Sequence, residues 1–414
     1  MIETKRRYHL HVGLGRLGLG LVLGLIRADI PIIITARTSK DWESRRPQLD
    51  GRRTLGLSNN CGLNRSVKVL WVDDNSSPIQ KELESEGVCS YLLIYSQLSD
   101  LDWVTQHCSS MTTSIGNQEE IEEWLERSNV YGDLTIYPFE NKITMTSSKN
   151  RIRRVVADRI CPDYPVFKDS LCSLSVQVEK YAQVVLNAPA EECKRLFLLE
   201  GSVNVIIAES DDLYSYYYHR KRRLVNGLHF DVATFGYQRL LELGVDKADW
   251  ETQYLTILIE SILNDRSQIQ HFIKVLIGAQ AMTLVCEADV LLPNDKSGVF
   301  LGRSAEQLYM ELCEFGESSL DRFRNVTDRL DRVLRLDKPE KLVENYREHL
   351  SELRDFIDTY RKDVDEFPAR LKPWAAEICR VVEVLTHAEH SIWAVLPDVW
   401  AKAQRKSVKA PQLT

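Results

Sequence analysis

The feature that most constrains the fold is a glycine-rich segment near residue 15. A β-like run, Tyr8-His-Leu-His-Val12, leads into Gly13-Leu-Gly-Arg-Leu-Gly18, and an apolar helical pattern follows from Leu21 to Arg27. A strand, a Gly-x-Gly-x-x-Gly turn and a helix in this order are typical of a dinucleotide-binding βαβ unit. The first glycine permits the tight turn, the second lets a pyrophosphate approach the backbone, and the third allows close packing of helix on strand. The alternative is a glycine-rich turn without a ligand.

This turn predicts a cofactor site at the amino-terminal end of the helix. Backbone N–H groups and a partial positive charge at that end favour phosphate binding. The predicted cofactor-binding residues of the turn are Gly13, Gly15, Arg16, Leu17 and Gly18.

The next strand indicates which dinucleotide is bound. The apolar run 31–36 is typical of a buried parallel strand. An acid usually follows such a strand and binds the ribose hydroxyls, but here Arg37, Thr38, Ser39 and Lys40 precede the first acid, Asp41. An arginine with nearby hydroxyls suits a 2′-phosphate, so Arg37 favours NADP over NAD. The alternatives are that Arg37 stacks on the adenine or lies in solvent.

Alternating elements continue to about residue 208. Further β-like runs are 67–72, 90–95, 133–137, 176–186 and 203–208, and 117–127 has a helical pattern. This alternation predicts an α/β Rossmann fold with a doubly wound sheet over residues 1–208. The pair Glu140-Asn141 follows one strand and is placed to reach the nicotinamide ribose or the substrate oxygen. Its other possible role is to cap a helix that runs to Ile160.

Helical periodicity replaces the β pattern from Asp211 onward. Amphipathic helices are expected at 230–243, 249–263, 269–285, 306–315, 338–364 and 371–395. Residues 209–414 are therefore predicted to form an all-α substrate and catalytic domain.

Composition narrows the class of protein. The 414 residues suggest two domains, and a net charge of −7 gives no overall attraction to nucleic acid or anionic membrane. The 9 cysteines form no Cys-x-x-Cys pair, which indicates reduced thiols in a cytoplasmic protein. No apolar run has the roughly 18 residues that a membrane helix needs. We expect a monomer or homodimer that binds a small molecule and no metal, because His387 and His390 lack further ligand motifs.

The segment that begins at Lys221 is the strongest candidate for catalysis. Lys221, Asn226 and His229 supply an amine, a carboxamide and an imidazole. On an α-helix, Asn226 lies roughly 140° and His229 roughly 80° round from Lys221, so the three share one broad face. A base, a donor to the substrate oxygen and an orienting group are what proton removal from an alcohol requires. The alternative is a solvated basic run, 219–223, that heads an amphipathic helix.

Taken together, these motifs resemble the polyol-specific long-chain dehydrogenases, which include mannitol 2-dehydrogenase, mannitol-1-phosphate 5-dehydrogenase and the hexuronate reductases. The resemblance runs from residue 8 to about residue 342, and includes the Arg-Phe-x-Asn segment that starts at Arg322. It implies an NAD(P)-dependent enzyme without a metal, with Lys221 as general base in oxidation and general acid in reduction. It implies that Asn226 and Asn141 donate to the substrate oxygen and that His229 orients the substrate. It also implies that Arg332 and, allowing a one-residue insertion, Lys341 lie near the far end of the substrate.

The chain departs from this family at several positions. Tyr218 and His219 stand where the family often has a glutamate before the lysine, and Val326 stands where it has proline. Arg222 and Arg223 make the site more basic, which favours a substrate with a phosphate or carboxylate. The charged segment 342–367 has no family counterpart. A second hypothesis is therefore an inactive dinucleotide-binding regulator or scaffold that uses 342–367 as its partner surface.

Overall fold

The computed structural model describes residues 8–72, 77–84, 89–127, 134–139, 151–158, 160, 165–168, 173–179, 181–198, 203–228, 268–292, 299–300 and 302–320. The chain divides into two compact units, Met1–Tyr214 and Ser215–Thr414.

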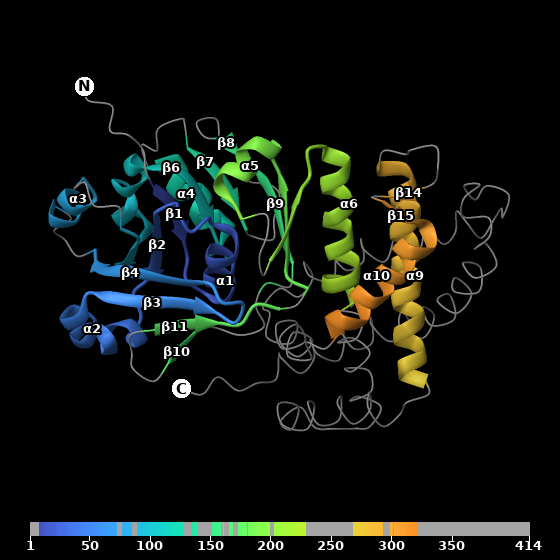
Figure 1. Ribbon diagram of the computed structural model, residues 1–414, viewed down its shortest axis with the longest axis horizontal. Coiled ribbons are helices and arrows are strands. Elements are labelled where there is room, and N and C mark those ends of the chain that lie inside the picture. The colour runs from blue at the N-terminus through green and yellow to red at the C-terminus, as the bar shows by residue number, and fades with distance from the viewer. Residues whose placement is uncertain are drawn as a thin grey trace, which may run out of the picture. The chain divides into compact units, whose positions relative to one another are not determined.

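A parallel sheet forms the centre of the first unit (Figure 1). Strand β1 (Tyr8–Val12) pairs in parallel with β2 (Ile32–Arg37) on one side and β6 (Cys108–Thr113) on the other. Beyond these, β5 (Tyr91–Tyr95) pairs with β2, and β7 (Thr135–Pro138) pairs with β6, again in parallel. The strand order reverses between β1 and β6, and the crevice at the carboxyl ends of such strands is where doubly wound sheets bind ligands.

Five further strands complete this sheet in the order β10-β11-β3-β4-β5-β2-β1-β6-β7-β8. Strands β3 and β4 form an antiparallel hairpin, β11 adds to β3 in parallel, and β10 is antiparallel to β11. The bounds are Thr54–Asn59 for β3, Asn64–Trp71 for β4, Arg151–Ile152 for β8, Val166–Lys168 for β10 and Ser173–Val176 for β11.

Apolar residues cover both faces of the central strands. Along β2, Ile32 and Ile34 join one buried cluster with residues of helix α1, whereas Ile33 joins a second cluster with Ile121 and Trp124. This split follows from the two-residue period of a strand.

The helices of the unit are α1 (Arg16–Leu25), α2 (Lys40–Arg52), α3 (Ser77–Glu84), α4 (Gln118–Arg127) and α5 (Ala190–Leu196), with 3-10 turns η1 (Leu98–Leu101) and η2 (Val104–His107). The predicted doubly wound α/β fold is confirmed.

One predicted helix is wrong where its residues are described. The helix expected to run to Ile160 is replaced by β8 and β9 (Arg154–Asp158) over 151–158. Strand β9 pairs antiparallel with β12 (Gln183–Asn187), which pairs in parallel with β13 (Asn204–Ile207) to form a second, three-stranded sheet. Val155 and Val156 are buried in it, and such β-branched side chains favour strands over helices.

Helices predominate in the described part of the second unit. Helix α6 (Asp211–Lys221) leads into a π-helical segment, η3 (Arg222–Gly227). Long helices α9 (Gln268–Leu291) and α10 (Ala305–Leu320) agree with the patterns at 269–285 and 306–315. A short ribbon of β14 (Val299–Phe300) and β15 (Arg303–Ser304) precedes α10. Within the described residues, none of the helices combines the length and apolarity needed to cross a bilayer.

Candidate functional site

The glycine turn lies at the carboxyl end of β1, next to the point where the strand order reverses. Gly13 has a φ of +105°, which an L side chain rarely adopts, and a Cβ there would meet Ile115 Cγ2 at 2.9 Å. Its N–H donates to the carbonyl oxygen of Thr35 at 3.2 Å, extending the ladder with β2. A Cβ on Gly18 would lie 2.0 Å from the carbonyl oxygen of Gly13, so glycine is required where α1 crosses the turn.

Gly15 differs from these two glycines. Its φ of −87° is open to any residue, and a Cβ placed there would meet nothing within 4 Å in the part of the chain that the structure describes. The described protein therefore gives no packing reason for glycine at this position. Gly15 is also the N-cap of α1, with no side-chain hydrogen bond to the first turn and no acidic residue in that turn. These features fit a phosphate group that would occupy the open space and bind the amino-terminal end of α1.

A buried chain of hydrogen bonds, the histidine chain, lies beneath this turn. Its members are Ser110, His9, Thr112, His11 and Gly13. His9 Nδ1 lies 2.9 Å from Ser110 Oγ, and His9 Nε2 lies 2.9 Å from Thr112 Oγ1. The same hydroxyl, Thr112 Oγ1, lies 2.7 Å from His11 Nδ1. His11 Nε2 in turn lies 2.7 Å from the carbonyl oxygen of Gly13. Both imidazoles are fully buried.

The carbonyl oxygen at the end of the histidine chain determines which atoms donate and which accept along it. A carbonyl oxygen only accepts, so His11 Nε2 carries the proton and Nδ1 accepts from the hydroxyl of Thr112. Thr112 then accepts from His9 Nε2, and Ser110 donates to His9 Nδ1. Both rings are neutral in this arrangement. Burial lowers the pKa of His11 to about 4, and burial, His11 and Arg65 lower the pKa of His9 well below its ordinary value. Neither histidine was predicted as a functional residue, although the alternation of His9 and His11 in an apolar strand was a signal.

Arg37 ends β2, at the same edge of the sheet. Its guanidinium forms an ion pair with Glu120 in the first turn of α4 and lies 5.9 Å from the centre of the Tyr95 ring. Thr38 Oγ1 donates to Glu43 at 2.8 Å, and Ser39 caps α2 by accepting from the N–H of Trp42. The side chains expected to hold a 2′-phosphate therefore already have protein partners, and two of these partners are carboxylates.

The end of β7 lies two strands from β1. The N–H of Phe139 donates to the carbonyl oxygen of Thr113 at 3.0 Å, which carries the β6–β7 ladder past the strand end. Tyr137 donates to Glu192, whose carboxylate also accepts from Arg153 Nε at 3.1 Å. These contacts fix the backbone that leads into the pair Glu140-Asn141.

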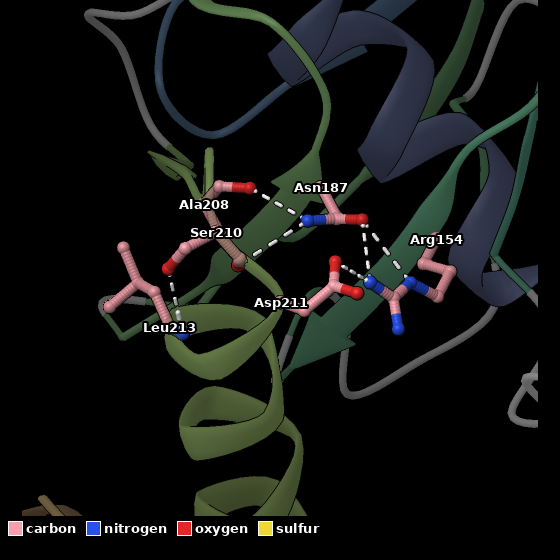
Figure 2. A network of polar contacts seen from close by, with 6 residues as sticks. All are labelled: Arg154, Asn187, Ala208, Ser210, Asp211 and Leu213. Atoms are coloured by element: carbon pink, nitrogen blue, oxygen red, sulfur yellow. Dashed lines mark hydrogen bonds and ion pairs between the residues drawn. The ribbon is translucent and has the colours of Figure 1, made fainter. Parts of the chain in front are cut away.

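A polar network fixes the beginning of α6, the helix that leads to Lys221 (Figure 2). Asn187, at the end of β12, donates from Nδ2 to the carbonyl oxygen of Ala208 at 2.9 Å and accepts from Arg154 at 3.0 Å. Arg154 also forms an ion pair with Asp211 in the first turn of α6. Ser210 Oγ accepts from the N–H of Leu213 at 3.2 Å, which caps the helix.

The segment after Lys221 departs from the α-helical geometry that the sequence suggests. Over Arg222–Gly227 the helix is of the π type, and the N–H of Leu228 donates to the carbonyl of Arg223, five residues earlier. Residues five apart therefore lie above one another, as residues four apart do in an α-helix. Lys221 and Asn226 have this spacing, so the 140° separation expected for an α-helix is wrong. Lys221, Arg222 and Asn226 are half-buried, whereas 223–225 are buried.

Helices α9 and α10 hold the π segment in place. Glu287 of α9 bonds to His219 Nδ1 at 3.0 Å and forms an ion pair with the buried guanidinium of Arg223. Ser319 of α10 donates to the carbonyl oxygen of Leu224 at 2.8 Å. Arg223 therefore has a structural ion pair, and the part of the anion-binding expectation that included it is not supported.

Gln280 is a further polar residue that the sequence analysis missed. It is fully buried, and neither atom of its amide has a hydrogen-bond partner in the described residues. It lies two turns before Glu287 on the same side of α9.

Several predicted site residues lie outside the described residues: Glu140, Asn141, His229, Arg332 and Lys341. The backbone of Arg16 is described as the first residue of α1, and its side chain is not.

Comparisons with known proteins give structural similarities only. No protein-family model matches the chain, and no curated protein matches it in sequence. A dimeric ketopantoate reductase from Staphylococcus aureus matches with a TM-score of 0.33 and 9% identity over 75% of this chain and 99% of that chain. Prephenate dehydrogenase from A. aeolicus, solved with hydroxyphenyl propionate and NAD+, matches with a TM-score of 0.33 and 11% identity over 87% and 99%. Octopine dehydrogenase matches with a TM-score of 0.36 and 10% identity over 74% and 72%. The doubly wound fold is shown by the strand order and by the parallel pairing of the central strands.

Proposed function

We propose that the chain is an NAD(P)-dependent oxidoreductase that interconverts a secondary alcohol and a ketone. The observation that carries this proposal is the glycine turn at the carboxyl end of β1, in which a Cβ on Gly15 would meet no atom of the described residues within 4 Å. Gly13 and Gly18 are explained by backbone conformation and packing, whereas Gly15 is explained by a ligand. In this proposal residues 1–208 bind the dinucleotide and residues 209–414 supply the substrate and catalytic groups.

The particular substrate that we propose is a polyol, a sugar phosphate or a related anionic polyol, as for the mannitol dehydrogenases. The order of the glycine turn, Asn141 and the Lys221 motif supports this choice. Arg222, Arg332 and Lys341 are the cations proposed to bind the substrate.

The proposed chemistry assigns one role to each side chain. A bound nicotinamide ring supplies the hydride acceptor in oxidation and the hydride donor in reduction. In oxidation, the neutral amine of Lys221 removes the hydroxyl proton, and in reduction its ammonium returns that proton to the carbonyl oxygen. Asn226 and Asn141 donate hydrogen bonds to this oxygen, and His229 orients the substrate. The π turn supports the pairing of Lys221 with Asn226, because it places residues five apart on one side.

Two measurements, made one after the other, test the proposal. Binding of NADH and NADPH is measured by the change in nicotinamide fluorescence on titration with the full chain. Turnover is then followed by absorbance of the reduced nicotinamide, with polyols, ketose phosphates and uronates as substrates and both cofactors. Binding of neither dinucleotide contradicts the proposal.

Lys221→Ala tests the assignment of the base. We expect cofactor binding to be kept and turnover to fall below a tenth of the wild-type value, an order-of-magnitude threshold of about 1.4 kcal/mol in the barrier. Lys194→Ala is a matched control, because Lys194 lies on the exposed side of α5 and pairs only weakly with Glu191 at 3.5 Å. Turnover above that threshold removes Lys221 from the mechanism.

The alternative, an inactive dinucleotide-binding regulator, depends on the segment 342–367, which lies outside the described residues. Cofactor binding without turnover on any member of the substrate panel would favour it.

A further inference from the structure

We propose that Glu120 determines which dinucleotide the chain binds, by accepting a hydrogen bond from a hydroxyl of the adenosine ribose and excluding a 2′-phosphate. This inference rests on the proposed function and deepens it. It assigns the ribose acid to α4, instead of to the end of β2, and it favours NAD(H) where the sequence alone favours NADP.

The geometry brings Glu120 to the expected ribose position from a distant part of the sequence. Arg37 ends β2, and Glu120 lies in the first turn of α4, after the carboxyl end of β6. Parallel strands β2, β1 and β6 end at the same edge of the sheet, and the ion pair between Arg37 and Glu120 joins two residues 83 positions apart. An acid or an arginine at this edge reads the ribose 2′ position in doubly wound sheets.

Glu120 is held in place yet remains accessible. Its N–H donates to Asn117 Oδ1, with 3.5 Å between the two atoms, and its side chain is 33% exposed. The guanidinium of Arg37 lies against the buried ring of Tyr95 and is 48% exposed. Both charged groups therefore reach the surface at the edge where a ribose would lie.

The charges at this edge oppose a second phosphate. A phosphate monoester carries roughly −1.5 to −2 charge at neutral pH, and it would have to displace Glu120 from Arg37 while lying beside it. Glu43, which accepts from Thr38, adds another carboxylate nearby. A ribose diol lacks that charge, and its hydroxyls can donate to the oxygen of Glu120 that Arg37 does not bind.

The test compares NADH and NADPH dissociation constants for the wild type and Glu120→Gln, measured by nicotinamide fluorescence. We expect the wild type to bind NADH at least about tenfold more tightly than NADPH, and Glu120→Gln to shift this ratio about tenfold or more towards NADPH. Glu123→Gln is the matched control, because it removes the same charge from the same helix where Glu123 pairs with Arg127 at 2.7 Å. Its ratio should stay within about twofold of the wild-type value.

A double variant separates release of Arg37 from a general charge effect. Arg37→Gln combined with Glu120→Gln should lose the NADPH affinity that Glu120→Gln alone gains, since the freed guanidinium is the phosphate partner. A wild-type preference for NADPH, an unchanged ratio in Glu120→Gln, or an equal shift in Glu123→Gln overturns the inference. If the wild type binds neither dinucleotide, the proposed function itself fails, and the two failures are thereby distinguished.

Discussion

The Nε2 atom of His11 lies 2.7 Å from the carbonyl oxygen of Gly13, so a buried imidazole directly supports the glycine turn. This contact ends the histidine chain and requires a proton on Nε2, while burial lowers the pKa of His11 and thereby keeps the ring neutral. The stability of the turn is therefore linked to the protonation of a side chain that the Gly-x-Gly-x-x-Gly pattern does not include.

We expect the free energy of unfolding to decrease as pH falls from 6.5 towards 4. The pKa of His11 is about 4 in the folded protein and ordinarily 6.5, so acid protonates the unfolded chain first. The contribution of this lowered pKa to the free energy of unfolding is complete above pH 6.5 and is lost progressively below that pH. The full loss is about 3 kcal/mol for His11 alone. Urea unfolding at pH 7.5, 6 and 5 measures this loss. His11→Gln should be less stable at pH 7.5 but should show a shallower pH slope, and identical slopes would contradict the prediction.

Gly18→Ala should destabilise the first unit. The added Cβ would lie 2.0 Å from the carbonyl oxygen of Gly13 and 2.8 Å from His11 Nε2. A backbone carbonyl cannot move aside without distorting the turn, so we expect a loss of at least about 2 kcal/mol. Thermal unfolding followed by circular dichroism measures the loss. A melting temperature equal to that of the wild type would show that α1 does not approach β1 as closely as described.

Gly15→Ala should leave the stability of the fold nearly unchanged but weaken dinucleotide binding. Among the described residues, no atom lies within 4 Å of the new Cβ, and the φ of −87° suits alanine, so the free energy of unfolding should change by less than about 1 kcal/mol. Dinucleotide affinity should fall about tenfold or more, because the methyl group occupies the space proposed for the pyrophosphate. Nicotinamide fluorescence titration measures the dinucleotide affinity, and the melting temperature measures the stability of the same variant. Unchanged affinity in this variant would remove the ligand explanation for Gly15.

Asn187→Ala should loosen the connection between the three-stranded sheet and the start of α6. The variant leaves the carbonyl oxygens of Ala208 and Ser210 without the donor Nδ2, and removes one of the two acceptors of Arg154, the other being Asp211. We expect a loss of about 1 to 3 kcal/mol in urea unfolding. Asn204→Ala is the control, because Asn204 is exposed at the start of β13 and should cost less than about 0.5 kcal/mol. Equal losses in both variants would be the contrary result.

Glu287→Gln should destabilise the second unit. Although burial raises the pKa of Glu287, the hydrogen bond from His219 and the charges of Arg223 and His219 lower it overall, so its carboxylate is ionised at neutral pH. The variant removes the carboxylate that forms an ion pair with the buried cation of Arg223, and we expect a loss of about 2 to 3 kcal/mol at pH 7. A lowered carboxyl pKa stabilises fully above the ordinary value of 4.5 and progressively less as pH falls towards the folded value, so the difference between variant and wild type should shrink as pH falls below 4.5.

Guanidinium unfolding at pH 7 and pH 4 checks both parts of the Glu287 prediction. Glu306→Gln, which removes an exposed carboxylate from the first turn of α10, is the control. A difference that grows at acid pH would contradict the sign of the linkage.

The sequence by itself determined the elements whose signal is local. The run Tyr8–Val12, the three glycines and the buried run around Ile32–Arg37 define strand, turn, helix and strand through periodicity and backbone freedom. The helices α9 and α10 were likewise predictable from their spacing of apolar residues.

Only the tertiary structure decided the features that depend on distant partners. Strand β6, Cys108-Ser-Ser-Met-Thr-Thr113, has no strong apolar pattern, because its Ser110 and Thr112 hydroxyls are satisfied by histidines about one hundred positions away. The π turn after Lys221 and the ion pair of Arg37 with Glu120 have the same origin. A periodic pattern reports which side of an element is buried, whereas the partner of a polar side chain is chosen by strand order and helix packing, which the local sequence does not encode.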